Sequence, residues 1–376
     1  MNFVPYFFLG YALLYISYQL VLLVRIILNE KFKIRFPFSE YPKVSILIAA
    51  RNEEGCILSC LTAIEQLQYP IDKIDVWIGD DQSTDATNEI VARFIQDKPN
   101  FHLISIRPST THVKGKANVL AQLAKLVTGE FLFITDADIQ VPTRWIESLL
   151  FAFKDSVGIV SGSTIVEGSS LLAKIQRIDW AYASGMIHVV SEMNIPVTAV
   201  GNNMAIRKSC YDEIGGYENL AFSVTEDLEL FLATIKRGWK FRNLLNADST
   251  AQSTPLHSLH EVLQQRKRWL SGALRVPKLL LLFLIIQAIY FPVLLLAFLY
   301  VPACWILPFG LTIFSLHVSF IGIVSRKINK QDIKKYILLF ELNRYIFPIL
   351  LFVYTLLPIG VQWKGRTYKG KEIQPK

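Results

Sequence analysis

The sequence predicts a mixed α/β domain with a mostly parallel sheet, held between hydrophobic segments on both sides. Hydrophobic residues make up 52% of the 376 residues, more than a soluble globular protein needs, and charged residues are dense only between about residues 31 and 275. Within that region short apolar runs alternate with stretches of helical periodicity. This alternation is typical of a parallel sheet covered by helices.

The first segment, residues 3–28, is an almost unbroken apolar and aromatic run long enough to span a bilayer as a helix. A signal peptide is the alternative, but the run is too long, no basic segment precedes it and no small-residue cleavage site follows it. Basic residues gather at and after its end: Arg25, Lys31, Lys33 and Arg35. The positive-inside rule therefore predicts a membrane anchor over residues 1–30 and a cytoplasmic domain after it, at the inner or plasma membrane.

The central domain is expected over residues 40–275. Strands are predicted at 44–50, 74–79, 101–106 and 131–135, and helices after residue 54, over 84–96 and near 116–125. Ligands of such sheets bind beyond the carboxyl ends of the strands, where the polar clusters of this sequence fall. A further helix at 171–190 is expected to pack in the core, with an interfacial helix resting on the membrane as the alternative.

A C-terminal membrane region is expected over residues 277–362. Residues 277–324 can form two spans with a turn near 300–302, and a third apolar run covers 345–361. One span before the domain and three after it would leave the basic tail, residues 363–376, outside, against the positive-inside rule. The last run is short and contains Pro348 and Pro358, so a re-entrant or interfacial helix is the alternative there.

Composition argues against several other functions. The four cysteines are scattered and predict neither a disulfide framework nor a zinc site, and His257 and His260 have no cysteine nearby. The net charge of +8 comes from Lys and Arg clustered beside the apolar runs, which favours an anionic membrane surface and an anionic substrate over nucleic acid.

The first polar cluster follows the strand at 74–79. Ser83 or Thr84 is expected to cap the next helix, which is a purely structural role. The adjacent carboxylates of Asp80 and Asp81 repel each other, and this is easier to tolerate if one of them accepts hydrogen bonds from a bound base or ribose.

The second cluster, Asp136 and Asp138, follows the strand at 131–135. Two carboxylates separated by one small residue can face the same cation, and hard oxygen ligands suit Mg²⁺ or Mn²⁺. By itself this pattern is as consistent with a solvated turn. Its place after a strand, next to Asp80 and Asp81, favours a metal that bridges the protein to a diphosphate.

The third cluster, Thr225-Glu226-Asp227, opens an amphipathic helix, where acids also act as caps and complement the helix dipole. The functional interpretation is that one carboxylate is a general base for an attacking hydroxyl. Further along, Arg268 could pair with a leaving diphosphate, and the Trp269 indole could stack on a sugar ring.

Taken together, the motifs resemble a known family. In order they read VSILIAARNEE, IGDDQSTD, KGKANVL, FITDADI, GNNMAIRKS, GGYENLAFSVTED and QQRKRW. This set looks like glycosyltransferase family 2 with the GT-A fold over residues 42–275, and the flanking helices resemble its membrane-bound branch of cellulose, chitin-oligosaccharide and hyaluronan synthases and ceramide glucosyltransferase.

The resemblance implies roles for individual residues. Ala49, Arg51 and Glu53 would border the nucleotide, with Asp80 or Asp81 on its base or ribose. Lys116 and Asp136 would lie near the diphosphate, Asp136 and Asp138 would hold the metal, and Asp227 would be the base. The junction of diphosphate and acceptor would be lined by Glu226, Gln265, Arg268 and Trp269. Arg51 stands where the family often has Tyr, and Gln82 where it often has Gly, which leaves the base preference open.

The expected reaction is a single displacement that inverts the anomeric centre. A nucleotide-sugar, by resemblance a UDP-sugar, would donate to a hydroxyl of a lipid-linked or membrane-associated glycan acceptor. A processive β-linked polysaccharide synthase is the first alternative, but three or four spans offer little material for a polymer channel. A non-catalytic assembly subunit is the second, and the retained acidic motifs argue against it. A nucleotidyl or phosphoryl transferase is disfavoured because no P-loop is present.

Overall fold

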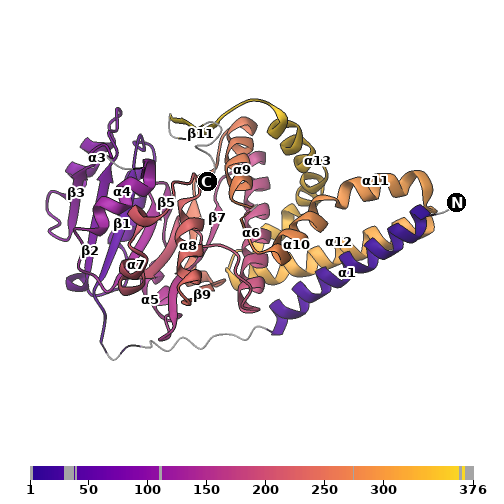
Figure 1. Cartoon of the computed structure of the whole chain (residues 1–376), viewed down its shortest axis with the longest axis horizontal. Coiled ribbons are helices and arrows are strands. Elements are labelled where there is room, and N and C mark those ends of the chain that lie inside the picture. Colours follow the sequence, from indigo (N-terminus) through magenta and orange to yellow (C-terminus); the bar gives the residue numbers. More distant parts are fainter. Residues whose placement is uncertain are drawn as a thin grey trace.

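The computed structural model describes residues 3–28, 38, 40–109, 112–273, 275–363 and 366–368. A sheet covered by helices forms one end of the molecule, and long apolar helices project from the other end (Figure 1). The residues Lys31, Lys33 and Arg35, which contributed to the predicted orientation, lie outside the described residues, as does the end of the basic tail from residue 369.

The main sheet has seven strands among the described residues, in the order β3-β2-β1-β4-β8-β6-β9. Their bounds are β1 Val44–Ala50, β2 Ile74–Asp80, β3 Phe101–Ser105, β4 Phe131–Asp136, β6 Val157–Ser161, β8 Asn203–Arg207 and β9 Lys240–Asn243. The four predicted strands are all present and parallel. β8 runs antiparallel to both β4 and β6, so the sheet is mainly parallel rather than wholly so.

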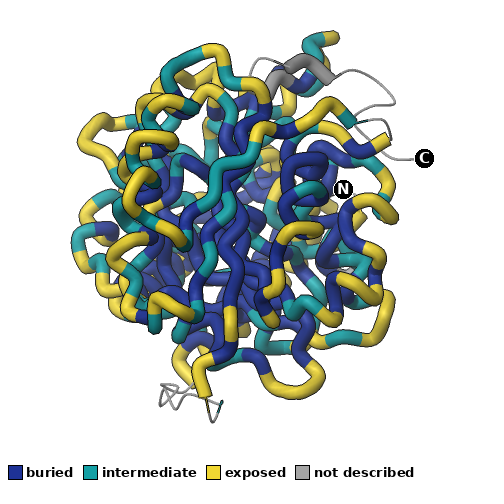
Figure 2. Tube along the Cα trace, turned by 90° about the vertical axis from the view of Figure 1, so that its left-hand side faces the viewer, coloured by how far each residue is buried: buried dark blue, intermediate teal, exposed yellow. Residues whose placement is uncertain are grey.

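Helices cover both faces of this sheet, which explains why its strands are apolar almost throughout. Ile46 and Ile48 of β1 face one side, against α2 (Ile57–Glu65), α3 (Thr87–Ile95) and α5 (Trp145–Leu150). Leu47 faces the other side, against α4 (Gly115–Ala124), α7 (Lys208–Ile214) and α8 (Glu226–Lys236). Figure 2 shows the buried strands enclosed by more exposed segments.

One local prediction is wrong. Helix α3 begins at Thr87, so neither Ser83 nor Thr84 caps it. The N-cap residue is Ala86, which makes no side-chain cap hydrogen bond, and Asp85 Oδ1 accepts a hydrogen bond from the Thr87 amide at 3.0 Å. The amide of Thr84 instead donates to Asn52 Oδ1 at 2.8 Å, which ties the loop after β2 to the loop after β1.

A small second sheet and two helices connect the domain to the apolar helices. The sheet consists of β5 (Ile139–Gln140), β10 (Thr250–Ser253) and β7 (Ser163–Val166). Helix α6 (Leu171–Glu192), predicted at 171–190, contacts β7 and β9 on one side and the apolar helices on the other. Helix α9 (Leu259–Ala273) stands beside it (Figure 1). The position of α6 therefore combines core packing with contact to the membrane region.

The apolar helices are α1 (Phe3–Leu28), α10 (Lys278–Ala288), α11 (Tyr290–Tyr300), α12 (Ala303–Lys327) and α13 (Ile337–Leu356). Among the described residues, three helical segments could cross a membrane by length and composition: α1, α12 and the segment Gln331–Leu356 that contains α13. The pair α10 and α11, bent by 43°, could supply a fourth crossing. α1 ends at Leu28 as predicted, and the turn between α11 and α12 lies at the predicted place.

Helix α13 differs from the other apolar helices. It contacts α6, α9 and the short helix η4 (Gln331–Tyr336), and it runs across the direction of α1 and α12 on the side of the domain (Figure 1). Only 6% of its apolar window is buried within the chain, against 33% for α1 and for α12. Whether this last apolar segment crosses the membrane or lies at its surface stays a prediction.

Candidate functional site

The site begins where the parallel strands end. Ala49 lies beside both Gly79 and Asp136 in the register of the sheet, and Ala50 lies beside Asp80. Because these strands are parallel, the loops that follow them leave the sheet at the same edge. The two predicted acidic clusters are therefore brought together by the sheet itself.

The loop after β2 is held by its own residues. Asp80 is buried, and its carboxylate accepts hydrogen bonds from the Ser83 amide at 3.2 Å and from Asn88 Nδ2 at 3.2 Å. Arg51 donates to the carbonyl of Asp81. Gln82 has a φ of 58°, in the left-handed region that favours glycine, which gives a physical reason for the glycine expected at this position. Asp81 is as buried as Asp80, and which of the two carboxylates faces a base or ribose stays a prediction.

Near this loop, Glu53 is buried, and its amide donates to Thr87 Oγ1 at 2.7 Å. The residues predicted to border the nucleotide, Ala49, Arg51 and Glu53, therefore lie in or directly after β1, beside the loop that carries Asp81. Their contact with a nucleotide stays a prediction.

The centre of the site is an ionic cluster around Lys116. Its Nζ lies 2.5 Å from Asp136 Oδ1 and 3.3 Å from Glu226 Oε1, and it donates to the Gly201 carbonyl at 3.1 Å. Burial by itself would lower the pKa of Lys116, but the two carboxylates raise it above its ordinary value. Lys116 is therefore a fixed positive charge between the second and the third acidic cluster.

The third acidic cluster opens α8. The Oδ2 of Asp227 accepts the Gly201 amide at 3.0 Å, and its Oδ1 accepts the Leu228 amide at 2.9 Å. Burial raises the pKa of Glu226, Lys116 lowers it, and Asp227 raises it further, with a net result above the ordinary value. Glu226 and Asp227 are thus adjacent carboxyl groups with different partners. Such a pair can divide the roles of proton donor and proton acceptor between its two members.

Helix α9 brings the basic residues of the last motif to this site. Arg268 Nη1 donates to the Val224 carbonyl at 3.4 Å, and the backbone of Gly272, one turn later, packs against Thr225 and Leu228 at the start of α8. Gln265 lies half-buried one turn before Arg268. Trp269 points elsewhere: its ring lies 5.4 Å from that of Trp180 in α6, with the Arg266 guanidinium 4.3 Å above it. Its contact with a sugar ring stays a prediction.

Two neighbouring cavities lie between α4, α8 and the loop at 220–225. One is lined by three basic residues, Lys114, Lys116 and Arg268, together with Glu226. This set suits an anionic group such as a diphosphate. The sequence analysis did not single out Lys114, although it belongs to the same KGKANVL motif as Lys116.

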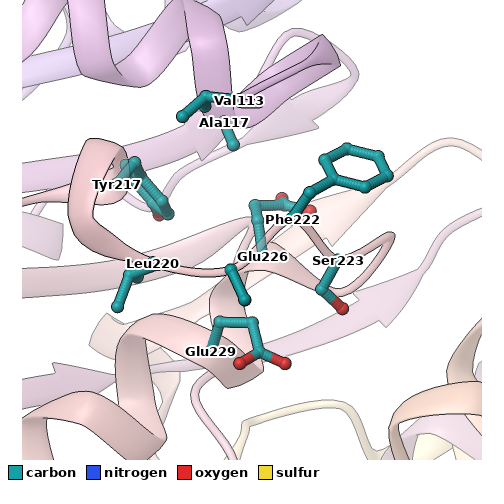
Figure 3. Close-up of a pocket in the computed structure, with 9 residues that line it drawn as sticks. Val113, Ala117, Tyr217, Leu220, Phe222, Ser223, Glu226 and Glu229 are labelled. Carbon is teal, nitrogen blue, oxygen red and sulfur yellow. The ribbon is translucent and has the colours of Figure 1, made fainter. Parts of the chain in front are cut away.

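The other cavity is lined by Tyr217, Phe222, Glu226 and Glu229 among others (Figure 3). The Tyr217 hydroxyl is buried and has no hydrogen-bond partner among the described residues. Burial, and then the charge of Glu226, raise the pKa of Tyr217. Sequence reasoning missed Tyr217, because nothing in a GGY triplet distinguishes a site residue from a core aromatic.

The predicted metal pair fits a divalent cation in part. Asp136 ends β4 with its side chain 34% exposed, and Asp138 lies in the turn before β5. Within the described part of the chain, no group of three or more His, Cys, Asp or Glu side chains could hold a metal ion. Two carboxylates would leave the other coordination positions to the diphosphate and to water, as is usual for Mg²⁺.

Comparison with known proteins indicates the class of protein. Residues 5–373 match the family described as glycosyl transferase family 21. The chain is 27% identical over 245 residues to beta-monoglucosyldiacylglycerol synthase of Nostoc sp., which covers 61% of this chain and 49% of that protein. It is 25% identical over 206 residues to poly-beta-1,6-N-acetyl-D-glucosamine synthase of Staphylococcus epidermidis, over 53% of this chain and 47% of that protein. The chain thus spans about half the length of these curated relatives.

Among solved structures, the mannosyltransferase PcManGT from Pyrobaculum calidifontis, in complex with GDP-Man and Mn²⁺, superimposes with a TM-score of 0.57 at 18% identity, over 92% of this chain and 97% of that one. This likeness shows the fold, so the predicted GT-A architecture is confirmed. The predicted resemblance to membrane-bound glycosyltransferases of the family 2 type is also confirmed, and the matching family model is that of family 21.

Proposed function

Because the chain belongs to glycosyl transferase family 21, we propose that it transfers a sugar from a nucleotide-sugar donor to a hydroxyl of a membrane lipid acceptor. One observation carries the proposal: three basic residues, Lys114, Lys116 and Arg268, line one cavity with Glu226, and Asp136 and Asp227 lie beside it. A basic cavity next to carboxylates suits a reaction in which a diphosphate leaves while a hydroxyl loses its proton.

The donor lies with its nucleotide over the ends of β1 and β2, bordered by Ala49, Arg51 and Glu53, with Asp81 on the base or ribose. Its diphosphate reaches the basic cavity, where Lys114 and Arg268 add positive charge to that of Lys116. The departing diphosphate gathers negative charge, so cations fixed beforehand in a half-buried site stabilise the transition state more than the ground state. UDP is the expected nucleotide.

Asp136 and Asp138 would hold a divalent cation, Mg²⁺ or Mn²⁺, which supplies further positive charge to the leaving diphosphate. The bound Mn²⁺ in the mannosyltransferase that shares the fold supports this assignment. The chain's own part is to orient the two carboxylates: Asp136 through its place at the end of β4, and Asp138 through a turn between β4 and β5.

Asp227 is the proposed base that takes the acceptor proton. Its two backbone hydrogen bonds, from Gly201 and Leu228, fix the orientation of the carboxylate. The acceptor oxygen bonds to the anomeric carbon as the bond to the diphosphate breaks, so the configuration inverts. Glu226 is a second candidate for the base, because burial raises its pKa above that of an ordinary carboxylate.

A lipid acceptor is favoured over a growing polysaccharide. α9, which carries Arg268 and Trp269, stands between the site and α13, so a lipid-anchored hydroxyl could approach from the membrane. The curated diacylglycerol-modifying relative supports this choice, whereas the poly-N-acetylglucosamine synthase supports the alternative of a polymerising enzyme.

In this proposal α1, the bent pair α10–α11 and α12 cross the membrane, while α13 lies at its cytoplasmic surface. After three crossings the chain is again on the side of the catalytic domain. Domain and basic tail then share the cytoplasmic side, which agrees with the positive-inside rule and removes the conflict found in the sequence.

The test is release of nucleoside diphosphate by the purified protein in lipid nanodiscs, with a panel of nucleotide-sugars and lipid extract, with and without Mg²⁺ or Mn²⁺. We expect metal-dependent release with one donor, strongly reduced in Asp138→Ala and in Asp227→Asn. Asp97→Asn, at an exposed position after α3, is the matched control and should behave as the wild type.

Labelled sugar should appear in an organic-extractable lipid. A ladder of long polymer would support the polysaccharide alternative instead. Absence of release with every donor would favour a non-catalytic subunit.

A further inference from the structure

Helix α9 makes contacts on two of its faces. Arg268 and Gly272 face α8 and the catalytic cavity. Gln264 and Lys267, which are three residues apart and so share one face of the helix, point to α13 instead. Residues of the same short motif therefore contact both α8 and α13. The proposed chemistry explains only the contacts with α8.

The contacts on the second face form a polar clamp, which we define as Gln264, Lys267 and Tyr354 with the carbonyls of Leu357 and Ile359. Gln264 Nε2 donates to the Tyr354 hydroxyl at 2.6 Å. Lys267 Nζ donates to the carbonyls of Leu357 at 3.2 Å and Ile359 at 2.9 Å, and lies 5.4 Å from the centre of the Tyr354 ring. Lys267 thus bonds carbonyls of the segment that directly follows α13, where the Leu357 carbonyl also accepts the Ile359 amide at 2.7 Å.

The clamp lies near the end of α13, where His260 of α9 also contacts Tyr354, with its Nδ1 3.4 Å from the hydroxyl. The exposed apolar residues of α13 form a stripe at helical spacing: Leu338, Leu342, Ile346, Ile349, Val353 and Leu356. Since 6% of the apolar window is buried in the chain, these exposed side chains are available for contact with lipid. A helix fixed in the membrane surface in this way offers α9 a support outside the catalytic domain.

We propose that Gln264, Lys267 and Tyr354 are positioning residues that hold α9 against the membrane-bound α13 and so keep Arg268 in the catalytic cavity. The inference rests on the proposed function for its kinetic readout. It also predicts that a membrane helix, and not the catalytic domain alone, sets the position of a residue that contacts the leaving diphosphate.

The test compares Lys267→Met, which keeps the aliphatic stem but loses the donor, with Lys267→Arg, which keeps a donor. In nanodiscs, Lys267→Met should lower kcat about tenfold or more with the donor KM within about twofold, because misplacing a group by about 1 Å can cost about a hundredfold in rate. Lys267→Arg should recover most of the loss. Lys236→Met, at an exposed position of α8, is the control and should leave kcat unchanged.

A double-mutant cycle separates positioning from a general structural role. If Lys267 acts through Arg268, Lys267→Met should cost less than about twofold in an Arg268→Ala background. An equal loss in both backgrounds, or an unchanged kcat in the single variant, would overturn the inference.

A second readout does not depend on turnover. Amide hydrogen exchange over residues 259–273 should be faster in Lys267→Met than in the wild type, and restored in Lys267→Arg. If the wild type turns over no donor but exchange is still faster in Lys267→Met, the proposed function is wrong while the clamp is supported. Equal exchange in the two proteins contradicts the clamp, whatever the activity.

Discussion

The backbone of Gly201 holds the carboxylate of Asp227: its amide donates to Oδ2 at 3.0 Å, and a Cβ at this position would lie 2.6 Å from the same oxygen. The close approach is possible only because residue 201 has no side chain. The same residue accepts a hydrogen bond from Lys116 through its carbonyl. One glycine thus links the proposed base to the central cation.

Gly201→Ala should therefore move Asp227 and lower activity. We expect kcat to fall about a hundredfold, because the base loses its alignment, with a small change in donor affinity. Nucleoside diphosphate release and donor titration would measure the two effects. Gly10→Ala is the matched control, since a Cβ there meets nothing within 4 Å. Wild-type turnover in Gly201→Ala would contradict the proposed role of Asp227.

Lys116→Met should destabilise the protein and make it more responsive to divalent metal. Removing the ammonium leaves Asp136 and Glu226 facing each other without a cation, at a cost of about 1–3 kcal/mol after allowance for the partial exposure of Asp136. Mn²⁺ should recover part of the loss by supplying charge at Asp136. The measurement is the apparent unfolding temperature with Mn²⁺ and with chelator.

The control for this variant is Lys125→Met, which breaks an exposed pair with Glu218 at 2.7 Å and should change little. The same Mn²⁺ response in Lys116→Met and in the wild type would argue against a metal at Asp136.

Stability should depend on pH through Glu226. Because its pKa is raised in the folded protein above the ordinary value of 4.5, the folded state binds the proton more tightly than the unfolded chain. Stability from this group therefore falls as pH rises from about 4.5 through the raised pKa. Glu226→Gln lacks this titration, so its unfolding temperature should improve relative to the wild type over the same interval. A pH-independent difference between the two proteins would exclude a raised pKa.

The proposed topology can be tested with a native cysteine. Cys304 is exposed at the start of α12, at the far end of the apolar helices from the catalytic domain, whereas Cys60 and Cys210 are buried. A membrane-impermeant thiol reagent applied to intact cells should label the wild type but not Cys304→Ser. Labelling of Cys304 only after the membrane is permeabilised would contradict the predicted orientation.

The sequence by itself determined the elements of the domain and the chemistry at the ends of its strands. The bounds of α1, β1 and most of β4 follow from runs of apolar residues, and the acidic pairs at 80–81 and 136–138 follow directly after strands. Such features depend on neighbours within a few residues, because helix and strand each impose a short repeat on their buried side chains. The parallel sheet then requires that these loops meet.

Tertiary structure decided which side chains meet and which do not. Lys116, Asp136 and Glu226 come from three separate elements. Only the packing of α4 and α8 beside β4 brings the two carboxylates within 3.3 Å of the Lys116 ammonium. The same holds for Trp269, which packs on Trp180. The predicted apolar run at 345–361 has the composition of a span, and the structure adds polar contacts to α9 that no local pattern predicts. Composition determines how apolar a helix is. Its position and tilt depend on the elements that it packs against.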